Sequence, residues 1–317
     1  MAWTDPHPVP PEAAGERLVD YLKAHLIVVP VNEIGDAVTG TTSCPPDITI
    51  EGRAETRTDS RLAAGDRLIV GASLETRLTA ENRLTPAVEI PLDVVHEDTN
   101  LIVLNKPAGT HVHPVGKYRD ATLLNGLVWR AGARPGNPWG AWRPHPAHRL
   151  DRPVSGLVLI AKSNAVSGAL NDLQQRDLLK RRYVAWVDGR AREDRGTIAQ
   201  PLGKDPAFEY RRAVLPVANG GQLAVTHWTV RERRDDRTLV ELDLDTGRTH
   251  QIRVHLASIG HPVCGDLLYA RTPVPGQKGA FSATRIALHS WQVAFEYGGR
   301  LFALTAEPPL GFDSIRP

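Results

Sequence analysis

The stretch PAHRLDRPVSGLVLIAKS, residues 146–163, places titratable side chains directly before an uninterrupted apolar run. The run from Gly156 to Ala161 is expected to be a buried strand, which puts Asp151 at the strand entrance between Arg149 and Arg152. Because a nearby opposite charge lowers the pKa of a carboxyl group by about 1 to 3 units, Asp151 is expected to stay ionised. An ionised carboxylate suits a nucleophile or an electrostatic stabiliser better than a general acid. The structural alternative is a turn stapled by an Asp–Arg ion pair.

Composition limits the setting of this motif. With 317 residues, 41% hydrophobic and 23% charged, the chain is long enough for one large domain and a smaller one. The formal net charge is only +2, so binding of a polyanion would depend on local basic patches. The cysteines, Cys44 and Cys264, form neither a disulfide framework nor a zinc-ligand spacing. Without a signal-peptide pattern or a membrane-length apolar run, the sequence predicts a cytoplasmic protein.

Pattern changes along the chain predict its organisation. Residues 1–14 carry four prolines and are expected to form a flexible arm. Residues 15–72 combine one helical period with short alternating segments, which indicates a small α+β module. A polar stretch at 73–89 is expected to be a linker. Residues 90–317 alternate strand patterns with a few helical ones, and they predict a mixed, mostly antiparallel sheet, so the fold class is α+β.

A second cluster, TGRTHQIRVHLASIGHPVCGDLLY at 246–269, interleaves arginines with histidines. If residues 248–256 are helical, Arg248 and Gln251 share one face, whereas His250 and Arg253 share another. No carboxylate or thiol stands at ligand spacing from these histidines, so contacts to phosphate are favoured over metal binding. The pair His111 and His113 is interpreted in the same way, and no metal site is predicted.

Two further features are weak on their own. Tyr183 follows the basic run Lys180–Arg182 into a strand pattern, where a packed tyrosine is the simpler interpretation. The tryptophans at 129, 139 and 142 lie near arginines, a mixture that also serves to hold unstacked nucleobases.

Taken together, these segments resemble the RluA-like pseudouridine synthases. The resemblance rests on NKPAGTHVHP, HRLDRPVSGLVLIAKS, RRYVAWVDG, TGRTHQIRVHLASIGHPVCGDLLY and ALHSWQVAF, in that order within about residues 90–310. It implies a pseudouridine synthase fold and an enzyme that detaches uracil from C1′ of a uridine in ribosomal or transfer RNA, turns it and rejoins it through C5. It also implies that neither cofactor nor metal is needed, and we expect a monomer.

The resemblance also implies roles for single residues. Asp151 matches the essential aspartate, Tyr183 the tyrosine that stacks on the target base, and Arg149 the arginine that helps to expel that base. Arg248 matches the basic partner of the aspartate, with Arg253 as the alternative. The remaining residues expected to bind substrate are Arg152, Lys106, His113, His250, Gln251 and Arg253. Whether Asp151 attacks C1′, attacks the ring or removes a sugar proton stays open.

The N-terminal module matches relatives only in part. Gly65–Val70 fits the ending of their small RNA-binding domain, but the segment VPVNEIGDAVTG at 29–40 contains no Lys or Arg. A degenerate RNA-binding domain is therefore expected, because phosphate contacts need cations. Two other functions compete with the synthase. A non-catalytic RNA-binding relative is disfavoured by the joint presence of Asp151, Tyr183 and Arg248, and a hydrolase by the absence of a G-x-S-x-G motif.

Overall fold

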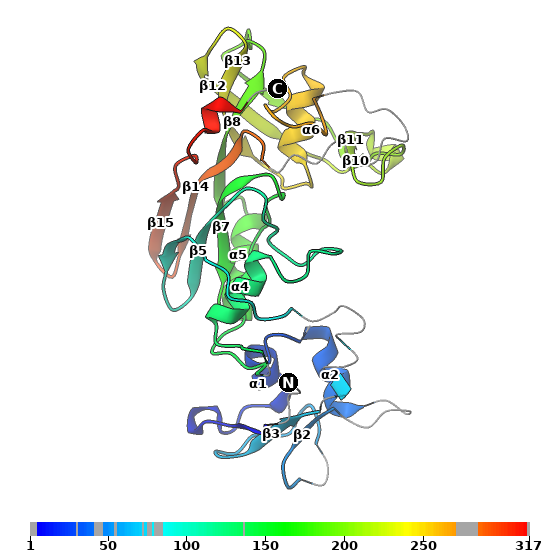
Figure 1. Cartoon of the computed structure of the whole chain (residues 1–317), viewed down its shortest axis with the longest axis vertical. Helices are drawn as coiled ribbons and strands as arrows, with labels where there is room; N and C mark the ends of the chain where they lie inside the picture. Colours follow the sequence, from blue (N-terminus) through cyan, green and yellow to red (C-terminus); the bar gives the residue numbers. More distant parts are fainter. Residues whose placement is uncertain are drawn as a thin grey trace. The chain divides into compact units, whose positions relative to one another are not determined.

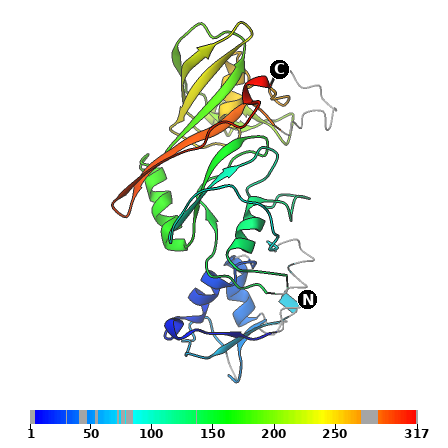
Figure 2. The same ribbon diagram turned by 60° about the vertical axis from the view of Figure 1, so that its left-hand side comes forward.

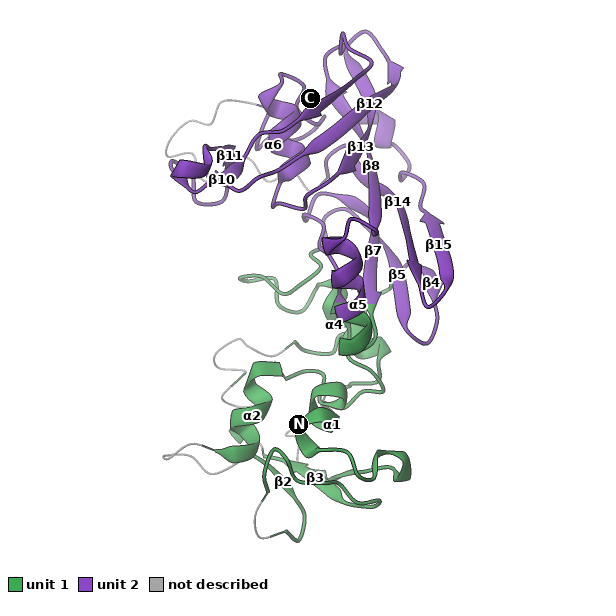
Figure 3. Cartoon of the chain, turned by 180° about the vertical axis from the view of Figure 1, so that it is seen from behind, with its two compact units in different colours: residues 1–92, 111–145, 161–167 green, residues 93–110, 146–160, 168–317 purple. Residues whose placement is uncertain are grey.

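The computed structural model describes residues 5–29, 31–40, 47–53, 56–71, 73–74, 78, 85–135, 137–270 and 285–315. Contacts divide the chain into two compact units (Figure 3). Unit 1 comprises residues 1–92, 111–145 and 161–167, and unit 2 comprises residues 93–110, 146–160 and 168–317. Much of the expected linker, and Cys44, lie outside the described residues. Residues 111–145, expected in the larger domain, thus group with the N-terminal module.

Unit 1 contains a small antiparallel sheet of order β1-β3-β2 beside short helices (Figure 1). The sheet elements are β1 (His7–Pro8), β2 (Ile48–Ile50) and β3 (Arg67–Val70), and the helical ones are η1 (Pro11–Ala13), α1 (Leu18–His25), α2 (Val31–Thr39) and α4 (Leu123–Arg130). Leu18, Tyr21 and Leu22 bury the face of α1 that the helical spacing predicts. Residues 5–14 of the expected arm supply β1 and η1, with His7 opposite Leu68.

The loop before residue 145 packs within unit 1. Arg143 is buried, and its guanidinium donates hydrogen bonds to the carbonyls of Lys23, Leu26 and Val29 at the end of α1. Trp139 is 7% exposed and stacks on His7. These contacts satisfy carbonyl groups near the end of the helix and fill the core. Neither side chain is therefore available to hold a nucleobase, the role that the sequence pattern had suggested for this mixture of tryptophans and arginines.

Unit 2 is built on a ten-stranded sheet of order β4-β5-β7-β14-β8-β13-β12-β9, with β15 beside β14 and β6 beside β7 (Figure 2). Its strands are β4 (Val94–Glu97), β5 (Leu101–Lys106), β6 (His145–Pro146), β7 (Ser155–Ala161), β8 (Lys180–Asp188), β9 (Arg195–Ile198), β12 (Thr226–Arg233), β13 (Arg237–Leu244), β14 (Leu288–Tyr297) and β15 (Arg300–Thr305). The strand β14 pairs with β7 in parallel and with β8 and β15 antiparallel. The expected α+β class with a mostly antiparallel sheet is confirmed.

Further elements lie outside this sheet. They are α5 (Asn164–Gln175), the hairpin β10 (Leu202–Lys204) and β11 (Arg212–Val214), η2 (Val217–Asn219), α6 (Gln251–Ser258) and η3 (Phe312–Ser314). The first of them, α5, has residues 164–167 in unit 1 and its remainder in unit 2. Helix α6 contacts both β11 and β12. Among the described residues, no helix is long and apolar enough to span a bilayer.

The close approach of β7 to β14 explains why the opening motif has serine at 155 and glycine at 156. Gly156 has φ +112°, and a Cβ atom there would lie 2.2 Å from the carbonyl oxygen of Ser290. Ser155 Oγ and His289 Nδ1 share a hydrogen bond of 2.8 Å between the same two strands. Only glycine fits at this point. The contacts between β7 and β14 fix the position of β7, the strand that follows the loop carrying Asp151.

Candidate active site

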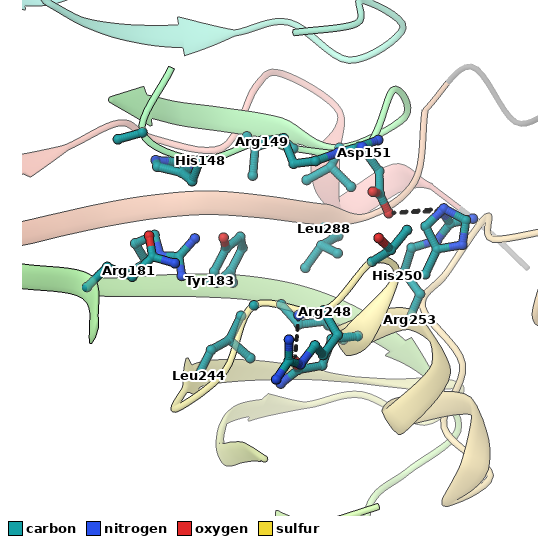
Figure 4. Close-up of a pocket in the computed structure, with 18 residues that line it drawn as sticks. His148, Arg149, Asp151, Arg181, Tyr183, Leu244, Arg248, His250, Arg253 and Leu288 are labelled. Atoms are coloured by element: carbon teal, nitrogen blue, oxygen red, sulfur yellow. Dashed lines mark hydrogen bonds and ion pairs between the residues drawn. The ribbon is translucent and has the colours of Figure 1, made fainter. Parts of the chain in front are cut away.

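The charged motif opens onto a pocket of about 180 Å³ within unit 2 (Figure 4). Its lining includes residues 147–151 before β7, Arg181 and Tyr183 of β8, the turn 247–250 and the first residues of α6, together with single residues of α5, β13 and β14. Seven sequence-predicted residues meet there, namely Arg149, Asp151, Tyr183, Arg248, His250, Gln251 and Arg253. The fold therefore joins the motif at 146–163 to the motif at 246–269.

Asp151 is held by groups at the start of α6. Its Oδ2 lies 3.1 Å from Nη1 of Arg253 and 3.7 Å from Nε2 of His250, and its side chain is 15% exposed. Burial acts to raise the pKa of Asp151, but the charges of His250, when it is protonated, and of Arg253 outweigh burial, so the pKa lies below its usual value. Burial also lowers the pKa of His250 to about 4. Near neutral pH the imidazole is uncharged, and Arg253, helped by Arg149, keeps Asp151 ionised.

A buried carboxylate that the sequence analysis missed fixes Arg253. Asp266 is 1% exposed and accepts two hydrogen bonds from the guanidinium, from Nε at 2.6 Å and from Nη2 at 2.9 Å. The guanidinium lies 5.0 Å from the ring centre of Tyr269, whose hydroxyl is 2.7 Å from Nδ1 of His250. The sequence did carry a signal for this carboxylate, since Asp266 stands within the apolar run VCGDLLY at 263–269. An acidic residue in a buried segment needs a charged or hydrogen-bonding partner.

The expected pairing of Arg248 with Asp151 is wrong, and the alternative, Arg253, is the partner. Helix α6 begins at Gln251, after His250 in a left-handed conformation with φ +60°. Oε1 of Gln251 accepts hydrogen bonds from the amide of Arg248 and the hydroxyl of Thr246, which locks the preceding turn. Arg248 is therefore exposed in the turn, and its Nε donates to the carbonyl of Leu223.

Gln251 and Lys106 serve the framework of the site, although both were expected to bind substrate. Gln251 is 3% exposed, and its amide bonds hold the turn and strand β12. Lys106 is 0% exposed, and its ammonium donates to the carbonyls of Pro107, Thr110 and Arg152. Burial lowers the pKa of Lys106 to about 7. This lysine ties the backbone just after Asp151 to the end of β5.

The other expected residues differ in position. Tyr183 is 5% exposed in the pocket wall, and Figure 4 shows its ring on the β8 side, while Arg149 and Asp151 come from the opposing segment. Arg152 is half-buried, with Nε 3.1 Å from the carbonyl oxygen of Gly109, and it is not among the residues that line the pocket. His113 belongs to unit 1.

One more residue of the pocket, His148, was not among the predicted site residues. His148 lines the pocket, and its Nε2 accepts a hydrogen bond from the amide of Leu159. Burial and the charge of Arg181 lower the pKa of His148 to about 3, so it is neutral.

Within the described ranges, no cluster of three or more His, Cys, Asp or Glu residues is arranged to hold a metal ion.

Comparisons with known proteins agree with this geometry. A family model described as RNA pseudouridylate synthase matches residues 100–258. A ribosomal large subunit pseudouridine synthase D of Nitrosomonas europaea is 40% identical over 238 residues, which cover 74% of this chain and 67% of that protein. An uncharacterised RNA pseudouridine synthase of Synechocystis is 35% identical over 266 residues, covering 80% and 75%. The solved structure of human RNA pseudouridylate synthase domain containing 1 has 25% identity and a TM-score of 0.54, covering 71% and 86%.

The chain therefore belongs to the RluA-like family of RNA pseudouridine synthases, as the resemblance implied. It is an isomerase that acts on RNA. The competing hydrolase is thereby excluded.

Proposed function

We propose that this synthase converts specific uridines of ribosomal RNA to pseudouridine and that Asp151 is its essential carboxylate. The observation that carries the proposal is an ionised, largely buried Asp151 inside a pocket whose wall contains Tyr183. Relatives named for the large ribosomal subunit favour ribosomal over transfer RNA. A cytoplasmic location and a monomeric state stay predictions.

The reaction rearranges one nucleotide without changing its composition. The bond from C1′ to N1 breaks, uracil turns, a bond from C1′ to C5 forms, and the hydrogen lost from C5 is replaced by a proton on N1. Because the base must first leave its stack at a cost of a few kcal/mol, the exposed Arg149 is placed to occupy the space that the base vacates. Tyr183 offers a ring against which the turned-out uracil stacks. Asp151 acts as an anion, on C1′, on the ring or on a sugar hydrogen.

The test compares Asp151→Asn with wild type in cells that lack the gene. Carbodiimide primer-extension mapping of all stable RNAs identifies the modified uridine and shows whether it lies in ribosomal or transfer RNA. We expect Asp151→Asn to form no pseudouridine while binding RNA within about tenfold of wild type, because Asn keeps the volume and removes only the charge. Asp172→Asn, at an exposed position of α5, is the matched control and should stay active. Near-normal turnover by Asp151→Asn would exclude an essential carboxylate.

A further inference from the structure

A second hollow adjoins the active-site pocket within unit 2. It has a volume of about 440 Å³ and is lined by the β10–β11 hairpin, the loop at 215–222 and the turn at Arg248 and Thr249. Arg248 and Thr249 also line the active-site pocket. The two spaces therefore share part of their lining.

The hollow is electropositive. Lys204, Arg212 and Arg248 line it, and none of the described residues in its lining carries a carboxylate. The neighbouring Asp205 lies 3.6 Å from Arg211, and both side chains are 13% exposed, so its charge is already balanced. Within the described part of the chain, the ammonium of Lys204 and the Nη atoms of Arg248 have no protein partner. Such unpaired cations attract phosphate.

The backbone leaves this space unfilled. A Cβ atom on Gly203 would lie 2.7 Å from Cδ1 of Leu215, so the hairpin and the loop approach closely at this point. Gly220 has φ +87°, and a Cβ there would meet nothing within 4 Å. Asn219 and Gln222 add neutral hydrogen-bonding groups to the lining. Small residues with amide donors beside cations are typical of sites that take a phosphate group closely.

The hairpin is anchored to the helix that holds Asp151. The amide of Arg212 donates to the hydroxyl of Tyr269 at 3.0 Å, and the Tyr269 ring packs against Arg253. Leu202 of β10 shares a buried cluster with Val254 of α6. Because these contacts fix the cations relative to Asp151, the hollow is preorganised for a ligand that also enters the active-site pocket.

We propose that this hollow binds the backbone phosphate of a nucleotide next to the target uridine, with Lys204 and Arg212 contacting the phosphate and Arg248 lying between the two spaces. The proposal rests on the proposed function, because the target uridine occupies the first space. The hollow thus sets the path of the RNA strand away from the reacting nucleotide.

The test uses the full chain with the double variant Lys204→Gln/Arg212→Gln. The control, Arg190→Gln/Arg192→Gln, removes the same charge from exposed positions that line neither space. Binding of a 20-nucleotide oligouridylate is measured from low to high salt. Since each contact with single-stranded nucleic acid contributes about 0.7 to the salt slope, we expect the test variant to lose roughly 1.4 units of slope and about tenfold in affinity. Equal losses in both variants overturn the proposal.

A second measurement separates this inference from the proposed function. On the mapped RNA, the test variant should need about tenfold more protein than the control Arg190→Gln/Arg192→Gln to reach half of its maximal single-turnover rate, because phosphate contacts position the strand. One uncharged methylphosphonate beside the target uridine should weaken binding by wild type but not further weaken binding by the variant. Equal weakening of both proteins at every position overturns the phosphate site. Failure of wild type to modify any RNA refutes the proposed function instead, and the oligouridylate result still decides the hollow.

Discussion

Replacing Arg253 by methionine tests how the site keeps Asp151 ionised. The guanidinium makes three charge-assisted hydrogen bonds of 2.6, 2.9 and 3.1 Å to two carboxylates, and its own side chain is 6% exposed. Asp266, at 1% exposed, would lose its ion-pair partner completely. Because removing one member of a buried pair costs about 3–5 kcal/mol, we expect a loss of that size in the free energy of unfolding.

Urea unfolding of wild type and Arg253→Met measures this loss. Arg17→Met is the control, because the Arg17–Asp20 pair is 51% and 47% exposed and solvent screens its ion pair, so its loss should change stability little. Adding Asp266→Leu to Arg253→Met should restore about 2 kcal/mol, since the buried unpaired charge is then removed as well. If Arg253→Met is no more destabilising than Arg17→Met, the buried pair does not support this region.

The same variant has a kinetic consequence. With Arg253 gone, burial of Asp151 is no longer offset by this cation, so the pKa of the carboxyl should rise. The acid limb of the pH dependence of single-turnover rates should then move to higher pH in Arg253→Met. An unmoved limb with reduced stability would show that Arg253 serves only the fold.

Three further predictions concern groups around the site. Lys106→Met should cost about 2–4 kcal/mol in urea unfolding and slow turnover, because three carbonyls lose their donor, whereas the exposed Lys117→Met should be neutral; equal effects would contradict the role given to Lys106. Gly156→Ala should cost more than about 3 kcal/mol of unfolding free energy because of its positive φ and its close contact with Ser290. The control, Gly168→Ala in α5, has open space around it and should stabilise by up to about 1 kcal/mol. Comparable melting temperatures of the two variants would refute the close approach of β7 and β14. Burial lowers the pKa of His250 from 6.5 to about 4, so the unfolded state binds this proton before the folded state does, and stability should fall by roughly 3 kcal/mol for this group as the pH drops from 6.5 towards 4. His250→Asn, whose side chain tolerates the left-handed backbone, should flatten this decline. An unchanged decline would show that another group causes it.

The sequence predicted the parts of this site that depend on local spacing. The apolar run after Asp151 is the buried strand β7. His250 and Arg253, which the sequence analysis grouped together, both approach Asp151, although His250 precedes the helix in a left-handed conformation. The position of Arg248 could not be predicted in this way. It depends on the bond from its amide to Gln251 and on the left-handed His250, which starts the helix later than the pattern suggested.

Long-range contacts explain the other misses. Lys106 follows an apolar strand pattern and looks like a surface cation, yet the Arg152 carbonyl that it binds lies 46 residues away in sequence. Asp266 meets Arg253 across 13 residues, through a turn that no local period describes. A buried charge is specified by its partners, and those partners are visible only in the folded chain.

The charge balance at Asp151 connects the active-site pocket with the adjoining hollow. One guanidinium, Arg253, faces two buried carboxylates, so this cluster keeps an excess of negative charge, and the neutral His250 adds no positive charge near neutral pH. An RNA phosphate approaching the cluster directly would be repelled. The cations that offset this repulsion lie at the edges, in Arg149 on one segment and in Arg248, Lys204 and Arg212 towards the hollow. Under the proposed function, phosphates are drawn to the rim, and the uncharged base is the part of the nucleotide best suited to enter the pocket.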